Sequence, residues 1–236
     1  MPTAAMIVIG DEILSGRTQD VNVQVLAQAL GARGITLAEV RVIPDDVATI
    51  VRTVNELRGQ MDNVFTSGGI GPTHDDITAD CIAQAFDVGI SIRDDARAIL
   101  ATNYADPEND LTDARLRMAR IPDGATLIDN PISKAPGFTI GNVHVMAGVP
   151  KIFAAMVESI IPTLTGGAPM LSDEVRIEKG EGTLAAPLGE IAARHPQVSI
   201  GSYPRAVDGR FVVNVVARST DADLLATVMA ELRQLA

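Results

Sequence analysis

Apolar residues in the first half of the chain form short continuous runs. These runs alternate with segments in which apolar residues recur every three or four positions, as on one face of a helix. Met6-Ile-Val-Ile9 is continuous and rich in β-branched residues, which is typical of a buried parallel strand. Further strands are predicted at 35–43 and 63–66, with a helix after each of the first two strands. The helix that follows 35–43 begins at Asp45 or Asp46, either of which can cap it. This alternation predicts a parallel sheet covered by helices on both faces.

The pattern becomes more polar between residues 87 and 124, where we expect helices separated by a loop at Pro107–Asp110. Short strands are predicted at 125–128, 138–140 and 143–147, and a helix begins at Pro150. The whole of this part, residues 1–168, is predicted to be one α/β domain.

A second, smaller domain is predicted at residues 171–236, after the linker Thr165-Gly-Gly-Ala-Pro169. Its pattern predicts a βαββα order, with strands at 174–179, 198–203 and 211–217 and helices at 187–194 and from Asp221 onward. Asp208-Gly209 is a typical hairpin turn between the last two strands. The expected product is a small α+β domain beside the first.

Composition and charge narrow the classes of function. The 236 residues include 30 acidic and 19 basic side chains, a net charge of −11, and no basic tail or stripe, so we expect no nucleic-acid partner. A single cysteine, Cys81, excludes a disulfide framework and a cysteine-based zinc cluster, and we expect it in the core. Neither a signal peptide nor a membrane-spanning stretch is visible, which favours a cytoplasmic protein without a membrane partner.

The strongest candidate site is the segment Thr66-Ser-Gly-Gly-Ile-Gly-Pro-Thr-His-Asp-Asp-Ile-Thr78, directly after the third strand. Its glycines let backbone amides approach an anion, and Asp75 and Asp76 follow at once. Phosphate on the amides beside two carboxylates calls for Mg²⁺ or a similar hard cation. Glycines alone would more often make only a tight turn, and aspartates alone a helix cap; together they favour a ligand site.

Two further segments end strands at the same edge of the predicted sheet. Gly10-Asp-Glu-Ile-Leu-Ser-Gly16, with Asp20 and Asn22 after it, can bring acids toward the glycine-rich loop, although this segment taken alone favours a solvated loop with Asp20 as a helix cap. Asn130–Gly137 supplies Lys134, which is either a solvated lysine or a partner for phosphate.

These motifs, together with Gly148-Val-Pro150, resemble the molybdopterin-binding (MoaB/Mog-like) domain over roughly residues 4–165. The resemblance is nearest to the branch present in competence/damage-inducible protein A (CinA) and in eukaryotic FAD synthase. The tail, with Gly201-Ser-Tyr-Pro204, is similar to the small domain that follows in those proteins.

The resemblance implies a three-layer αβα sandwich with a mostly parallel sheet, in a homo-oligomer that is a dimer or trimer. It implies that Asp11, Asp75 and Asp76 are catalytic and hold a divalent metal, which would be Mg, Mn or Co. It also implies a small-molecule ligand, a nucleotide or a pterin, in a site formed by Ser67, Gly68, Gly69, Gly71, Thr73, Glu12, Asn22, Lys134, Gly148 and Pro150.

Three functions follow as hypotheses. The first is a metal-dependent hydrolase that cleaves the phosphoanhydride of ADP-ribose, FAD or a related dinucleotide. The second is molybdenum cofactor biosynthesis, by binding or adenylylating molybdopterin. The third is a non-catalytic nucleotide-binding or RNA-binding module, but the tail lacks the basic GXXG loop that KH-type RNA recognition needs. CinA proteins also carry an amidohydrolase domain, and nicotinamide mononucleotide deamidase activity is not expected of this chain.

Overall fold

The protein is described here from a computed structural model that covers residues 1–207 and 210–236. The chain divides into two compact units, Met1–Gly167 and Ala168–Ala236, and each is described by itself. The predicted turn at Asp208-Gly209 lies outside the described residues.

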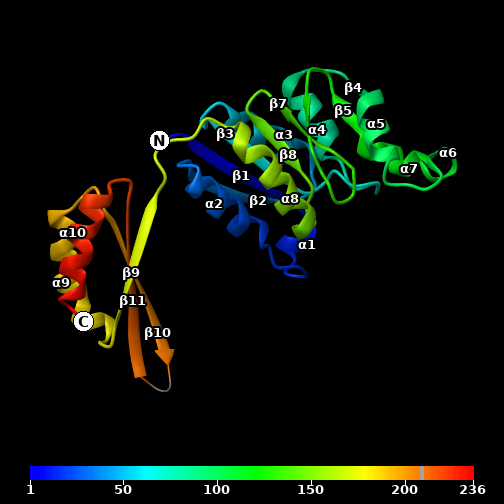
Figure 1. The fold of residues 1–236 in the computed structure, drawn as a ribbon. Helices are drawn as coiled ribbons and strands as arrows, with labels where there is room; N and C mark the ends of the chain where they lie inside the picture. Colours follow the sequence, from blue (N-terminus) through cyan, green and yellow to red (C-terminus); the bar gives the residue numbers. More distant parts are fainter. Residues whose placement is uncertain (208–209) are drawn as a thin grey trace. The chain divides into compact units, whose positions relative to one another are not determined.

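The first unit is built on a six-stranded sheet with the order β2-β1-β3-β8-β7-β6 (Figure 1). Four of the six strands run parallel and adjacent to one another: β1 (Thr3–Ile9), β2 (Thr36–Ile43), β3 (Asn63–Ser67) and β8 (Val143–Met146). The strands β7 (Gly137–Ile140) and β6 (Thr126–Ile128) continue the sheet antiparallel to their neighbours. The sheet is therefore mostly parallel, as the sequence predicts.

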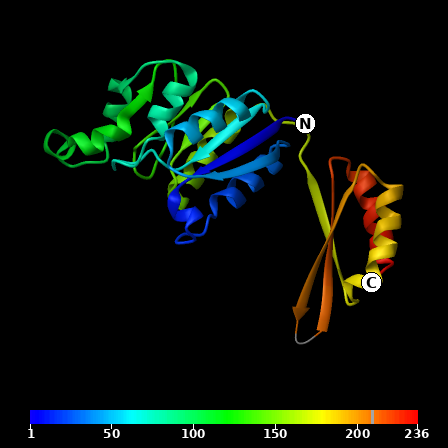
Figure 2. The same ribbon diagram turned by 180° about the vertical axis from the view of Figure 1, so that it is seen from behind.

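Helices cover both faces of this sheet (Figures 1 and 2). Consecutive residues of β1 alternate between the two cores, because successive side chains of a strand point to opposite faces. Ala5, Ile7 and Ile9 pack with α3 (Val47–Arg58) and α4 (Thr78–Phe86). Ala4, Met6 and Val8 pack with α2 (Asn22–Ala32) and α8 (Pro150–Ile160). The unit is thus a three-layer αβα sandwich, which confirms the predicted fold class.

A helical segment precedes β6. It contains α5 (Asp94–Ala101), α6 (Pro107–Asp110), α7 (Asp113–Leu116) and the 3₁₀ turn η1 (Arg117–Ala119), and a small two-stranded sheet of β4 (Ile90–Ile92) and β5 (Arg120–Pro122) flanks it. The prediction of a loop at Pro107–Asp110 is wrong. Pro107 occupies the first turn of a short helix, where its missing N–H costs no hydrogen bond.

Two short helices complete the first unit. The helix α1 (Asp11–Leu14) follows β1 directly, and the 3₁₀ turn η2 (Ile161–Thr163) ends α8. Neither buries a residue of its own, so both serve as connections at the surface.

The second unit is a three-stranded antiparallel sheet, β10-β11-β9, with two helices packed on one face. Its elements are β9 (Leu171–Ile177), α9 (Glu181–Arg194), β10 (Ser199–Val207), β11 (Arg210–Ser219) and α10 (Ala222–Arg233). The βαββα order agrees with the sequence, but the predicted start of the first helix at Pro187 is wrong. The helix begins six residues earlier because Leu184, Leu188 and Ile191 already form its buried stripe.

Two titratable side chains are buried in the first unit. Cys81 is 1% exposed on α4, and burial raises the pKa of its thiol to about 11, which confirms a core residue rather than a reactive one. His144 is 4% exposed on β8 and bonds Thr139 and Asn63 through its two ring nitrogens. Among the described helices, none is long and apolar enough to cross a membrane.

Candidate functional site

A cleft of about 490 Å³ opens at the carboxyl ends of the parallel strands. This is the edge where loops lead from strands into helices, and where open α/β sheets bind their ligands. The volume lies within the usual range for small-molecule sites. The lining comes from the ends of β1, β2, β3 and β8 and from the helical segment: Ile9, Gly10, Glu12, Thr18, Asp45, Gly68, Gly69, Ile70, Gly71, Pro72, Asp75, Asp76, Met118, Asn130, Ala135, Ala147, Gly148, Val149, Pro150 and Ile152.

The glycine-rich loop needs its glycines. Gly68 and Gly69 have φ angles of 108° and 70°, a region that side chains with a Cβ rarely adopt. A Cβ on Gly68 would also collide with the carbonyl oxygen of Ile9, and one on Gly69 with the hydroxyl of Thr78. That hydroxyl donates to the carbonyl of Gly68 at 3.0 Å, so the loop is fastened to the start of α4. The loop therefore presents bare backbone to the cleft.

The two aspartates follow the loop in a tight turn. The amide of Thr73 donates to Oδ2 of Asp76 at 2.8 Å, and its hydroxyl donates to the same oxygen at 2.5 Å. The amide of Asp76 donates back to the carbonyl of Thr73 at 3.2 Å. The neighbouring Asp75 is exposed, and the Thr73 hydroxyl chiefly lowers the pKa of its carboxyl. Thr73 thus orders both carboxylates at the cleft.

Asn22 ties three segments together beneath the cleft. It is 3% exposed, and its side-chain amide donates to the hydroxyl of Ser67 and to the carbonyl of Gly148, both at 2.8 Å. The hydrogen bonds join the start of α2 to the end of β3 and to the loop before α8. Asp20 accepts from the amide of Val23 at 3.0 Å in the first turn of α2, which agrees with its interpretation as a helix cap.

Asp45 is the acidic residue of the cleft that the sequence analysis missed. It was considered only as a helix cap, but Asp46 fills that role by accepting from the amide of Thr49 at 2.8 Å. Asp45 instead accepts from the amide of Asp11 at 3.0 Å. Partial burial raises the pKa of its carboxyl, as do the nearby charges of Asp11, Glu12 and Asp75. The signal was present in the sequence, since Asp45 follows a strand that ends at the same edge.

The structure brings most of the predicted site residues together. Eight of them line the cleft: Glu12, Gly68, Gly69, Gly71, Asp75, Asp76, Gly148 and Pro150. Ser67, at 2% exposure, and Asn22 lie beneath it and hold its walls. Thr73 lies beside it and orders the carboxylates.

Two of the predicted residues are not placed in the lining. Asp11 is exposed, and it reaches the cleft only through the bond from its backbone amide to Asp45. Lys134 lies nearby in a left-handed backbone conformation, with φ 58°, and its amide donates to Asn130. Their roles in binding and catalysis stay predictions.

The walls of the cleft differ in character. Glu12, Asp45, Asp75 and Asp76 form an acidic side, whereas Ile70, Met118, Val149 and Ile152 form an apolar side. None of the described residues that line the cleft is a lysine or an arginine. A phosphate here would meet backbone amides and carboxylates, so it would need a cation as a partner.

The carboxylates of the cleft suit a hard divalent cation that takes its remaining ligands from water and from a bound phosphate. Among the described residues, no three histidine, cysteine, aspartate or glutamate side chains are grouped closely enough to hold a metal by themselves. Mg²⁺ commonly takes only one or two carboxylates and completes its shell with water and ligand phosphates. The donors of the cleft are all oxygen atoms, which suits this mode of binding.

Comparison with known proteins identifies both units. Residues 5–166 match the family described as "Probable molybdopterin binding domain", and residues 169–236 match "FAD synthase, middle domain". The crystal structure of the protein CinA from Thermoplasma acidophilum, whose function is unknown, superposes with a TM-score of 0.64 at 33% identity. The match covers 69% of this chain and 97% of that one.

Two curated relatives extend the match. A protein of Pyrobaculum calidifontis is 32% identical over 88% of this chain and 83% of its own length. A "Probable FAD synthase" of Caenorhabditis elegans is 30% identical over 99% of this chain, which spans 50% of that longer protein. The matches thus cover the whole chain, not the first unit alone.

Proposed function

The chain belongs to the molybdopterin-binding (MoaB/Mog-like) domain family, and from this premise we propose that its cleft binds a dinucleotide and hydrolyses the phosphoanhydride. The proposed substrates are ADP-ribose, FAD or a related compound. The observation that carries the proposal is the bare backbone of Gly68 and Gly69 beside the carboxylates of Asp75 and Asp76 in one cleft.

The two walls suit the two parts of such a ligand. The amide of Gly68 already donates to the carbonyl of Met146 at 3.1 Å, so we assign the phosphoryl oxygens to the amides that follow it in the glycine-rich loop, which can donate to them and stabilise the charge that develops on them. The apolar side chains Met118, Val149 and Ile152 offer contact area to a planar ring.

We propose that one or two of the carboxylates of Asp75, Asp76, Asp45 and Asp11 hold a divalent cation, which would be Mg²⁺, Mn²⁺ or Co²⁺, with water and ligand phosphates as its other ligands. Such a cation, when bound, would polarise a phosphoryl oxygen and offset the repulsion between the phosphates and these acids. Partial burial is the main cause of the raised pKa of Asp45, and the charges of Asp11, Glu12 and Asp75 add to it, so a cation here would offset repulsion between neighbouring acids.

The reaction needs a water molecule and a proton acceptor. The water oxygen attacks one phosphorus, the bridging P–O bond breaks, and the bridging oxygen leaves on the second phosphate. ADP-ribose then yields AMP and ribose 5-phosphate. The carboxylates of Asp45, Asp75 and Asp76 line the cleft and are the groups that can accept the proton of the water.

The test is a screen of ADP-ribose and FAD with each of the three cations, with release of AMP as the measurement. We expect metal-dependent release of AMP by the wild type and its loss in Asp76→Ala. The variant also excludes a contaminating phosphatase as the source of the AMP. Equal, negligible rates for both proteins across all metals and substrates would reject hydrolysis.

A second candidate is work on the molybdenum cofactor, by binding or adenylylating molybdopterin. The family match and the apolar wall of the cleft favour it, because a pterin is planar and molybdopterin carries a phosphate. Pterin fluorescence that copurifies with the protein, or a saturable titration without hydrolysis of dinucleotides, would select this function over the first.

We also propose that the protein forms a homo-oligomer. Val40 and Val42 on the edge strand β2 are 38% and 40% exposed, which is unusual for two β-branched side chains on one face of a strand. Light scattering coupled to size exclusion measures the mass directly, and a monomer at micromolar concentration would contradict the proposal.

A further inference from the structure

We infer that Arg117 is a positioning residue for the carboxylates of the cleft, acting through the backbone of Asp76. The inference rests on the proposed function for its catalytic consequence, but its structural core can be tested without any ligand. Arg117 itself is not part of the cleft lining.

The first step is the geometry of the turn that Arg117 contacts. Asp76 makes three hydrogen bonds with Thr73, and all of them lie within the turn. On its other side, the carboxylate lies so close to Gly71 that a Cβ there would come within 2.6 Å of Oδ2. These contacts fix the shape of the turn, and the bonds of Thr78 to Gly68 and Gly69 tie its end to the glycine-rich loop, but neither set attaches the turn to the helical segment that precedes β6.

Arg117 supplies that attachment. Its Nη2 donates to the carbonyl oxygen of Asp76 at 3.0 Å, across 41 positions of sequence. A guanidinium bond to a carbonyl is charge-assisted and stronger than a neutral one. Arg117 also lines a cavity of about 10 Å³ together with Gly69, Gly71 and Asp76, so it lies directly behind the glycine-rich loop.

A second observation concerns the energetic cost of placing the Arg117 guanidinium behind the glycine-rich loop. The Nε atom of Arg117 is buried and has no hydrogen-bond partner among the described residues. Burial of an unpaired donor is unfavourable, and a water molecule needs about the volume of this small cavity. A surface arginine would simply keep all of its donors in solvent.

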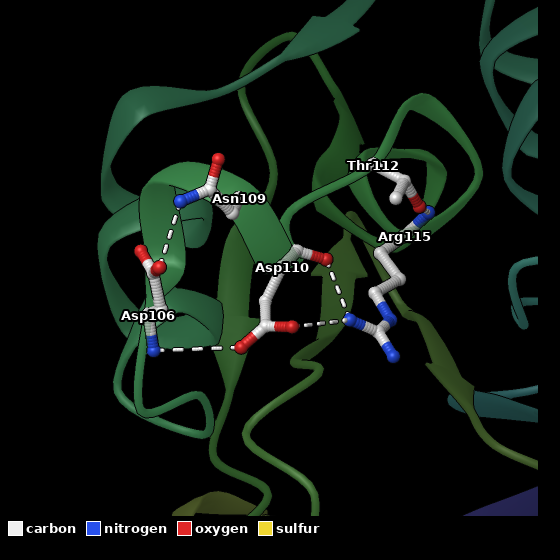
Figure 3. Close-up of polar contacts among 5 residues, drawn as sticks. All are labelled: Asp106, Asn109, Asp110, Thr112 and Arg115. Carbon is white, nitrogen blue, oxygen red and sulfur yellow. Dashed lines mark hydrogen bonds and ion pairs between the residues drawn. The ribbon is translucent and has the colours of Figure 1, made fainter.

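The segment that carries Arg117 is itself anchored (Figure 3). Just before it, the Nη1 of Arg115 donates to the carbonyl of Asp110 at 2.6 Å, and its guanidinium stacks over the ring of Tyr104 at 4.7 Å. Just after it, Arg120 holds Asp80 on α4 with two hydrogen bonds of 3.0 and 2.6 Å. Contacts on both sides of Arg117 in the sequence therefore hold the segment from which its side chain reaches Asp76.

The same short turn reaches the cleft from the other side, because Met118 belongs to its apolar wall. The turn η1 thus couples the carboxylate side, through Arg117, to the apolar side, through Met118.

The test compares Arg117→Gln with Arg117→Lys and with the matched control Arg97→Gln, which removes an exposed arginine of α5 from the same helical segment without touching the turn. Hydrogen–deuterium exchange of the amides in residues 72–78 is the ligand-free readout. We expect exchange there to rise about tenfold in Arg117→Gln, in keeping with the loss of one charge-assisted bond. It should rise less in Arg117→Lys and stay unchanged in Arg97→Gln.

Hydrolysis of ADP-ribose in the presence of Mg²⁺ is the second readout. We expect kcat to fall about tenfold in Arg117→Gln with KM nearly unchanged, since displaced carboxylates affect the reaction more than the binding. Wild-type exchange at residues 72–78 in Arg117→Gln would overturn the inference. A wild type without hydrolysis would reject the proposed function alone, because the exchange result still decides the role of Arg117.

Discussion

The side-chain amide of Asn22 donates to the carbonyl oxygen of Gly148 at 2.8 Å, although the two residues are 126 positions apart in the chain. The same amide also reaches Ser67, so one buried side chain holds three loops of the cleft. The cleft is therefore a property of the assembled sheet rather than of any single motif.

Replacement of Asn22 by alanine should loosen this arrangement. The hydroxyl of Ser67 and the carbonyl of Gly148 would lose their partner in a buried place, which costs about 1–3 kcal/mol of the free energy of unfolding. Urea denaturation measures this loss, and ligand affinity should fall with it. The exposed Asn55→Ala on α3 is the matched control, and an equal effect of both variants would contradict the role of Asn22.

Gly69→Ala should distort the glycine-rich loop. The φ of 70° and the collision with the Thr78 hydroxyl together predict a loss of about 1–3 kcal/mol in the free energy of unfolding, and weaker binding of any phosphate ligand. Gly31→Ala is the control, because a Cβ there meets no atom within 4 Å and alanine favours its helix. A Gly69→Ala protein as stable as wild type would show that the loop tolerates a Cβ.

Asp45→Asn separates stability from ligand binding. Asparagine keeps an oxygen that can accept from the amide of Asp11, and it removes one of several neighbouring carboxylates. Without metal we expect the thermal midpoint to stay level or to rise, as is common when a strained functional site is relieved. Magnesium titration by calorimetry should show weaker binding than in wild type; unchanged affinity would remove Asp45 from the proposed cation site.

Protonation of His144 should destabilise the first unit at mildly acidic pH. Burial lowers the pKa of its imidazole from 6.5 to about 4, so the folded protein resists a proton that the unfolded chain accepts. The stability from this group is complete above pH 6.5 and is lost as the pH falls toward 4. By linkage the loss is about 2 kcal/mol between pH 7.5 and pH 5.

The measurement is the free energy of unfolding in urea at several pH values, compared between wild type and His144→Asn. The difference between the two proteins should shrink as the pH falls, because the variant lacks the titrating group. His74→Asn is the control, since the His74 side chain is fully exposed. A pH-independent difference between wild type and His144→Asn would contradict the lowered pKa.

Sequence patterns predicted the sheet, its helices and the edge that bears the cleft, because strand runs and glycine-rich turns depend on local chemistry. They missed what depends on distant partners. Asp45 and Asp46 are identical in type and adjacent, and only the structure shows that one caps a helix while the other faces the cleft. Arg117 is not among the predicted site residues, because its contact with Asp76 crosses 41 positions.

Two errors in secondary structure have local causes. The sequence predicts a loop at Pro107, but proline is also common in the first turn of a helix. The sequence predicts a helix start at Pro187 because proline is common in the first turn of a helix, whereas Pro187 lies inside α9. There the burial of Leu184, Leu188 and Ile191 outweighs the missing hydrogen bond.

The position of β8 in the sheet has a consequence for how the protein is made. It pairs with β3 although 75 residues separate Ser67 from Val143, and the loop that follows it contains Gly148, which Asn22 must reach. Contacts of such long sequence separation form late, since the chain must close a large loop first. A nascent chain still short of β8 can order β1 to β3 and the glycine-rich loop, but it cannot yet bind. Ligand capture should therefore begin only after about two thirds of the polypeptide has emerged from the ribosome.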